Sequence, residues 1–181
     1  MIAALKYTHD DLLSMPEDGK RREIIDGELY VTPSPVNYHQ KILLNLTYAF
    51  CKFLETHPVG EVRFAPLDVI LSEFDVLEPD LLFVLNEHRD FLQDWVRGAP
   101  DLVVEILSPG TEARDRGIKL KAYARYGVGE YWIVDPNAQV IEVYRLAAEG
   151  FRRAARCARG KTVETPLLHG FCLPVDSVFK P

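Results

Sequence analysis

Residues 99–136 read APDLVVEILSPGTEARDRGIKLKAYARYGVGEYWIVDP, and this stretch decides the fold. The apolar run 102–107 is typical of a buried strand. The turn residues that follow it end at Thr111, which can cap the start of a helix. Gly127 ends that helix, and 131–134 is again typical of a strand. The stretch therefore predicts a strand, a tight turn, a helix and a second strand.

Glu105 places a carboxylate inside the first of these strands. A buried charge is costly unless it is paired or binds a cation, so Glu105 either lies at an exposed strand end or belongs to a site. The helix that follows carries Asp115, Lys119, Tyr123 and Tyr126. Their spacings of four, four and three residues place them along one helix face. A carboxylate strand followed by a lysine-bearing helix is the strongest chemical signal in the sequence.

The composition of the 181 residues is that of an ordinary globular protein, with 48% hydrophobic and 27% charged residues, and it predicts one domain over 1–181. The net charge of −6 argues against a broad basic surface for nucleic acid, although metal ions can offset an acidic active site. Cys51, Cys157 and Cys172 lack CxxC spacing, which predicts reduced thiols and a cytoplasmic protein. We expect no secretory signal and no membrane span.

The remaining chain predicts strands and helices around the central stretch. Asp26-Gly27 indicates an N-terminal β-hairpin, and Val62 to Leu71 resembles one strand with Pro66 as a bulge or edge. The other predicted elements are a helix over 38–57, a strand over 81–85, a hairpin over 131–144, one or two strands over 151–164 and a last helical turn near 173–179.

Asp80 stands at the mouth of the short apolar strand 81–85, as Glu105 stands in its own strand. The interval between them has room for a short helix and a neighbouring strand, so the two carboxylates can converge. Two carboxylates and a backbone carbonyl suit Mg²⁺ or Mn²⁺, with waters completing the coordination. Such an ion polarises a phosphoryl oxygen, and a nearby ammonium would offset charge in the transition state.

Several other polar residues have two possible interpretations. Glu23, on the first hairpin strand, is either solvent-facing or part of the site. His39, at the core-facing start of the helix over 38–57, either packs there or serves in acid–base or phosphate contact. Lys119 either forms a surface ion pair with Asp115 or belongs to the site, and for the two tyrosines of that helix we expect packing. One basic cluster is either a solvated strand edge or a phosphate contact: Arg152, Arg153, Arg156, Arg159 and Lys161.

Two short segments, Glu78-Pro79-Asp80 and Val104 to Pro109, resemble the PD-(D/E)XK nuclease pattern. Further matching segments are 22–29, 33–35, His39, 115–123 and 127–136. Together they resemble the large bacterial family of uncharacterised restriction endonucleases within that superfamily. The resemblance covers roughly residues 8–179.

The resemblance implies an α/β (α+β) fold with a restriction-endonuclease-like core, in which helices flank a mixed central β-sheet beside an N-terminal β-hairpin. It also implies DNA cleavage with Mg²⁺ or Mn²⁺, held by Asp80, Glu105 and the backbone carbonyl of Ile106. Glu23 matches an acidic residue of the N-terminal segment, and His39 matches a recurrent position beside the site. A homodimer and a further partner that confers specificity are also implied.

The sequence departs from the superfamily pattern at Leu107, where a lysine is usual. The resemblance assigns that lysine to the next helix, which points to Lys119; Lys121 faces another way. The leading hypothesis is a metal-dependent endonuclease. An inactive nuclease-fold module for nucleic-acid or protein binding is the alternative, favoured by Leu107 and the acidic balance. A nucleotide-binding domain that uses 108–111 is a weaker third, because the phosphate-binding glycine motifs are missing.

Overall fold

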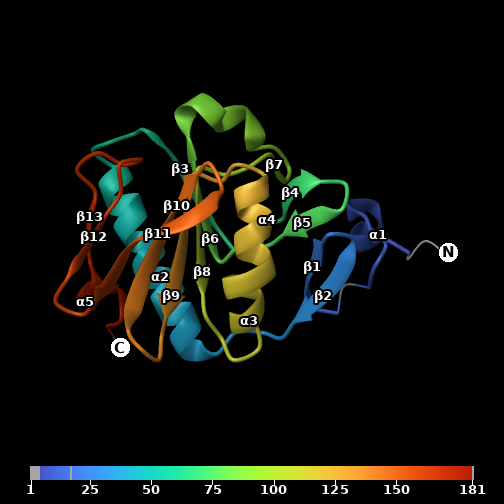
Figure 1. Cartoon of the computed structure of the whole chain (residues 1–181), viewed down its shortest axis with the longest axis horizontal. Coiled ribbons are helices and arrows are strands. Elements are labelled where there is room, and N and C mark those ends of the chain that lie inside the picture. Colours follow the sequence, from blue (N-terminus) through green and yellow to red (C-terminus); the bar gives the residue numbers. More distant parts are fainter. Residues whose placement is uncertain (1–4, 17, 181) are drawn as a thin grey trace.

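The largest element of the fold is a six-stranded mixed sheet. The structure is a computed structural model that describes residues 5–16 and 18–180. The strand order across the sheet is β11-β10-β9-β8-β6-β3 (Figure 1). In chain order the strands are β3 (Gly60–Phe64), β6 (Leu81–Leu85), β8 (Leu102–Ile106), β9 (Glu130–Asp135), β10 (Val140–Ala147) and β11 (Gly150–Ala158). Strands β8 and β9 run parallel and the other neighbours antiparallel, so the predicted mixed sheet flanked by helices is confirmed.

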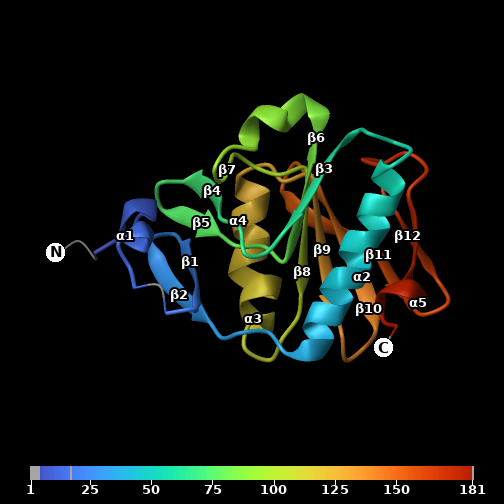
Figure 2. The same ribbon diagram turned by 180° about the vertical axis from the view of Figure 1, so that it is seen from behind.

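Helices cover both faces of this sheet (Figures 1 and 2). Helix α2 (Asn37–Leu54) packs on one face, and the helical segment α3 (Glu112–Arg114), η2 (Asp115–Lys119) and α4 (Leu120–Arg125) packs on the other. Alternation along β8 sends Val104 and Ile106 toward α2 and Val103 toward α4. Glu105 therefore faces the helical segment that carries Lys119. The alternation of side chains along β8 thus brings the Glu105 carboxylate to Lys119.

A second, five-stranded sheet lies beside the first, in the order β2-β1-β5-β4-β7 (Figure 1). Its strands are β1 (Arg21–Ile25), β2 (Glu28–Thr32), β4 (Val69–Ser72), β5 (Asp75–Leu77) and β7 (Val96–Arg97). The turn from β1 to β2 needs positive φ at Asp26 (55°) and Gly27 (83°), a conformation that aspartate, asparagine and glycine tolerate best. The N-terminal hairpin is thus not a separate appendage, because β1 also pairs with β5.

One predicted strand is wrong. Val62 to Leu71 does not form a single strand: β3 ends at Phe64 in the six-stranded sheet, and β4 begins at Val69 in the other sheet. Pro66 stands between them and has no N–H to donate to a ladder, so the chain can leave one sheet there and join the next.

The remaining elements are short. They are α1 (His9–Leu13), η1 (Asn86–Phe91), the pair β12 (Thr162–Glu164) and β13 (Cys172–Pro174), and α5 (Val175–Val178). The tail docks as the predicted last turn of helix, with Val175 and Val178 buried against the core. Within the described residues, no helix combines the length and apolar character needed to cross a membrane.

Candidate active site

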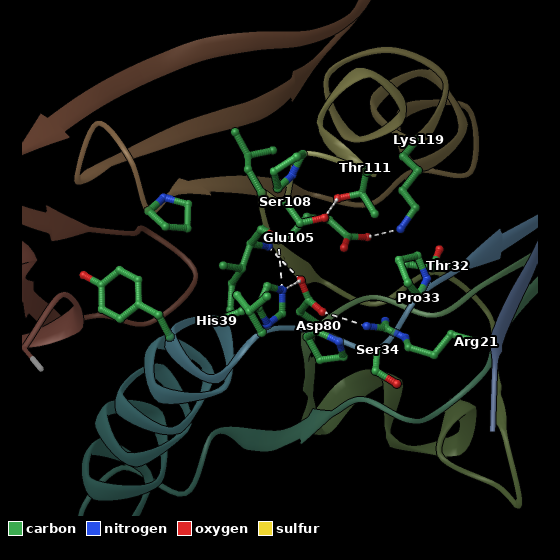
Figure 3. A pocket seen from close by; sticks show the side chains of 18 of the residues that line it. Arg21, Thr32, Pro33, Ser34, His39, Asp80, Glu105, Ser108, Thr111 and Lys119 are labelled. Atoms are coloured by element: carbon green, nitrogen blue, oxygen red, sulfur yellow. Dashed lines mark hydrogen bonds and ion pairs between the residues drawn. The ribbon is translucent and has the colours of Figure 1, made fainter.

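The predicted site residues line one cavity of about 370 Å³ (Figure 3). Its walls come from the β2–α2 segment, the β8–α3 turn and the β9–β10 turn. Its charged and imidazole side chains are Arg21, Glu23, His39, Asp80, Glu105 and Lys119. Only 3% of the surface of Glu23, Asp80, Glu105 and Lys119 is exposed, so these four charged groups lie at the buried end of the cavity.

Asp80 is held from three directions at the start of β6. Its Oδ2 accepts a hydrogen bond from the Ile106 backbone N–H at 2.8 Å and lies 3.2 Å from His39 Nε2. Its Oδ1 accepts from Arg21 Nη1 at 3.2 Å. Burial alone would raise the pKa of Asp80, but the His39 hydrogen bond and the Arg21 charge hold the pKa below its usual value. Asp80 is therefore a fixed, ionised carboxylate.

Glu105 presents one engaged and one open carboxylate oxygen. Its Oε1 accepts from Lys119 Nζ at 2.9 Å and from the Tyr123 hydroxyl at 3.2 Å. Among the described residues no hydrogen bond reaches its Oε2, which is turned away from Lys119 (Figure 3). Burial raises the pKa of Glu105 well above its ordinary value; Lys119 opposes this shift, and Asp115 and Asp80 add to it. The open oxygen gives a cation a place to bind.

Lys119 is enclosed by carboxylates. Its Nζ lies 2.7 Å from Glu23 Oε1, 2.9 Å from Glu105 Oε1 and 3.6 Å from Asp115 Oδ1. Burial would lower the pKa of Lys119, but these carboxylates outweigh it and raise the pKa, so the side chain is an ammonium. The interpretation as a surface ion pair with Asp115 is wrong, because both side chains are buried. Lys121 is exposed and does not line the cavity.

A π-helical turn, η2, sets the helix face that carries these groups. In an α-helix each four-residue step overshoots one turn by about 40°. In the wider π turn, the four-residue step from Asp115 to Lys119 covers less than one full turn. It therefore compensates for the α-helical step from Lys119 to Tyr123, which covers more than one turn, and the three side chains stay on one face. Tyr123 is therefore not only a packing residue. Tyr126 departs from this face, and its hydroxyl lies 2.7 Å from Asp75 Oδ2 in the second sheet.

Arg21 and Glu78 belong to the site and were missed in the sequence. The Nε of Arg21 lies 2.6 Å from Glu78 Oε1, and its Nη2 donates to the Glu78 carbonyl at 2.6 Å. With Nη1 on Asp80, the guanidinium joins the end of β5 to the start of β6. A signal was available, since Arg21 and Glu23 alternate on β1 and so share one face.

We expect Arg21→Lys to weaken divalent-metal binding by about 10–100-fold, as for other residues that orient a metal ligand. A lysine cannot hold Glu78 and Asp80 together with the planar fork of arginine. Titration with Mn²⁺ by calorimetry measures the effect. Arg22→Lys is the matched control, because Arg22 pairs with Asp18 outside the cavity. Equal affinities in both variants would show that Arg21 does not orient Asp80.

The charge balance of the buried group fits a divalent cation. Its acids are Glu23, Glu78, Asp80, Glu105 and Asp115, whereas its permanent cations are Arg21 and Lys119. No cluster of three or more His, Cys, Asp or Glu side chains is arranged as a metal cage within residues 5–16 and 18–180. The available donors are instead two carboxylates and a backbone carbonyl. Mg²⁺ accepts such a partial set because it retains several waters.

The fold is that of the restriction-endonuclease-like nucleases. Residues 9–176 match the model of the Uma2 family, described as "Putative restriction endonuclease", and the chain belongs to that family. It is 30% identical over 135 residues to an uncharacterized protein of Synechocystis sp., covering 72% of this chain and 69% of the relative. A crystal structure described as "a putative nuclease belonging to DUF820", from Anabaena variabilis, superposes with a TM-score of 0.79 at 20% identity. That match covers 95% of this chain and 97% of the other, and it shows the shared fold.

Proposed function

We propose that the protein is a metal-dependent endonuclease that hydrolyses phosphodiester bonds in DNA. One observation carries the proposal within this nuclease family: Asp80, Glu105 and a buried lysine converge on one cavity. A purely structural core does not account for the excess of buried acids over buried cations, because a buried charge without a partner costs stability.

Asp80, the open oxygen of Glu105 and the Ile106 carbonyl would hold Mg²⁺ or Mn²⁺. When bound, the ion supplies Lewis-acid polarisation of the phosphate and a lowered pKa for bound water. The Ile106 carbonyl lies 3.2 Å from His39 Nε2, so His39 touches two of the proposed ligands and positions them. Arg21 keeps Asp80 oriented from the other side.

Lys119 acts as an electrostatic group and not as a base, because its raised pKa keeps it protonated. Its ammonium would offset the charge that develops on the phosphate. Glu23 holds that ammonium at 2.7 Å and itself accepts from the Glu78 backbone N–H at 2.9 Å. In this proposal Lys119 supplies the positive charge that Leu107, at the usual lysine position, does not supply.

The test is incubation with supercoiled plasmid and with single-stranded DNA in Mg²⁺, Mn²⁺ or EDTA. We expect cleavage with either metal, none in EDTA, and none from Glu105→Gln. The second candidate is an inactive module that binds nucleic acid or protein, which the net charge of −6 and Leu107 favour. DNA binding without cleavage in every metal would establish the module instead.

We propose a homodimer, as the resemblance to the nuclease family implies, to be measured by analytical ultracentrifugation. A specificity partner and a cytoplasmic location stay predictions. Proteins that co-purify with the tagged chain from its own cells test for the partner. Detection of the tagged chain in cell fractions tests the location.

We expect metal binding to release protons. Burial raises the pKa of Glu105, so its carboxyl holds a proton at pH values where an exposed glutamate has lost it. A cation must displace that proton, and its affinity should rise with pH until the raised pKa is passed. Calorimetry in buffers of different ionisation enthalpy measures the release. Glu105→Gln should release fewer protons; an unchanged number would place the titrating group elsewhere.

A further inference from the structure

The walls of the cavity nearer its rim carry several apolar side chains, and none of these has a role in the proposed hydrolysis. They come from all three segments that frame the cavity (Figure 3). The apolar members are Pro33, Pro35, Val36, Tyr38, Leu107, Pro109 and Pro136. Val36 is 69% exposed and Pro109 is also exposed, so these walls reach the rim while the acids lie below.

The depth of the acids restricts what can reach them. With Asp80 and Glu105 each 3% exposed, a scissile phosphate has to enter the cavity. A volume of about 370 Å³ lies at the small end of ligand pockets, which suits one nucleotide and not a duplex. A paired base stays stacked in the duplex, so a phosphate that descends into the cavity must bring its own sugar and base with it.

We propose that the cavity binds one unstacked nucleotide, with its phosphate at Asp80 and Glu105 and its base against the apolar walls. This inference rests on the proposed function and names its substrate class: DNA with unpaired nucleotides, either a single strand or a distorted duplex. Apolar and aromatic surfaces bind the flat faces of all bases, so this contact carries little sequence preference. Unpaired nucleotides also avoid the cost of leaving the base stack.

The side chains at the cavity support this placement. The hydroxyl of Tyr38 donates to the Phe179 carbonyl at 3.3 Å, which fixes the ring instead of leaving it free to swing out. Ser108 and Thr111 hold each other at 3.0 Å at the β8–α3 turn, where their hydroxyls can reach a sugar or a base edge. The cavity therefore combines a charged base, which holds the acids together with Arg21 and Lys119, with apolar walls and a few hydroxyl groups.

The first test compares cleavage of three end-labelled DNAs with the same sequence: a single strand, a matched duplex and a duplex with a central unpaired bubble. In Mn²⁺ we expect the single strand and the bubble to be cut at least about tenfold faster than the matched duplex, with bubble cuts confined to the unpaired region. A matched duplex cut as fast as the single strand overturns the inference and leaves the nuclease function intact.

The second test measures binding and does not require cleavage. With Ca²⁺ in place of Mg²⁺, fluorescence anisotropy compares an oligothymidine with the same backbone made fully abasic. Loss of base stacking should weaken binding roughly 10–100-fold. Equal binding of the two strands overturns the base contact. A weaker abasic strand together with no cleavage of any DNA supports the base contact while the proposed nuclease function fails.

A matched pair of variants locates the contact. Tyr38→Ala should lose most of the difference between oligothymidine and the abasic strand. Tyr48→Ala should keep it, because Tyr48 lies on the same helix but is 65% exposed and outside the cavity. Thermal melts check that both variants fold. If Tyr38→Ala does not fold, Val36→Ser serves in its place, because Val36 is exposed at the rim. Retention of the full difference by the folded rim variant overturns the assignment of the base to these walls.

Discussion

Replacing Lys119 by alanine should reduce cleavage by roughly 10²–10³-fold, the usual effect of removing a preorganised electrostatic group. Among the described residues that line the cavity, Arg21 is the other Lys or Arg side chain, and it cannot replace Lys119 at Glu105 because Glu78 and Asp80 already engage it. Single-turnover cleavage in saturating Mn²⁺ measures the loss. Lys121→Ala is the matched control, since Lys121 is exposed and lies two residues further along the same helical segment. Full activity in Lys119→Ala would leave the cation role unassigned.

The same variant should also lose stability, because Lys119 is buried and is not part of a surface ion pair. Its removal leaves the carboxylates of Glu23, Glu105 and Asp115 buried without their ammonium. Breaking a buried ion pair in this way costs about 3–5 kcal/mol. Melts in EDTA and in Mn²⁺ separate the two effects: the deficit should shrink in Mn²⁺, because the metal ion supplies positive charge to the same acids.

Mn²⁺ should raise the melting temperature of the wild-type protein and not that of Glu105→Gln. A ligand at a hundredfold excess over its Kd stabilises the native state by about 2.7 kcal/mol. For a chain of this size that corresponds to roughly 5–10 °C. Glutamine keeps the shape of Glu105 and removes its charge, so packing is preserved.

Glu112→Gln is the control for this experiment. Glu112 is an exposed acid at the start of the helical segment that follows β8, and it pairs with Arg116 outside the cavity. It should show the wild-type rise in melting temperature. An equal rise in Glu105→Gln would place the ion at other residues.

The sequence was sufficient to find the acids but not the network that orients them. Glu105 stands out because it interrupts an apolar strand, Asp80 because it stands at the start of one, and Lys119 follows from helical spacing. All three line the same cavity. Arg21 shares a strand face with Glu23, but nothing local indicates its partners, which lie 57 and 59 residues further along the chain. Contacts of that range depend on how two sheets dock.

The boundary between the two sheets was beyond local sequence patterns for the same reason. A window around Pro66 shows an apolar run with one proline, which fits a bulged strand as well as two separate strands. The π turn at η2 likewise leaves no signal in the sequence, because Asp115 and Lys119 have the same spacing as an α-helical ion pair. Tertiary contacts decide between such alternatives.

The supply of Arg21 and Glu23 from the second sheet means that the active site is a composite of distant chain segments. The chain is synthesised from its N-terminus, so these two residues leave the ribosome early. Lys119 follows roughly a hundred residues later. A nascent or partly folded chain therefore lacks an assembled centre. Under the proposed function, such an arrangement couples cleavage to completed folding, so that unfinished chains would not cut nucleic acid.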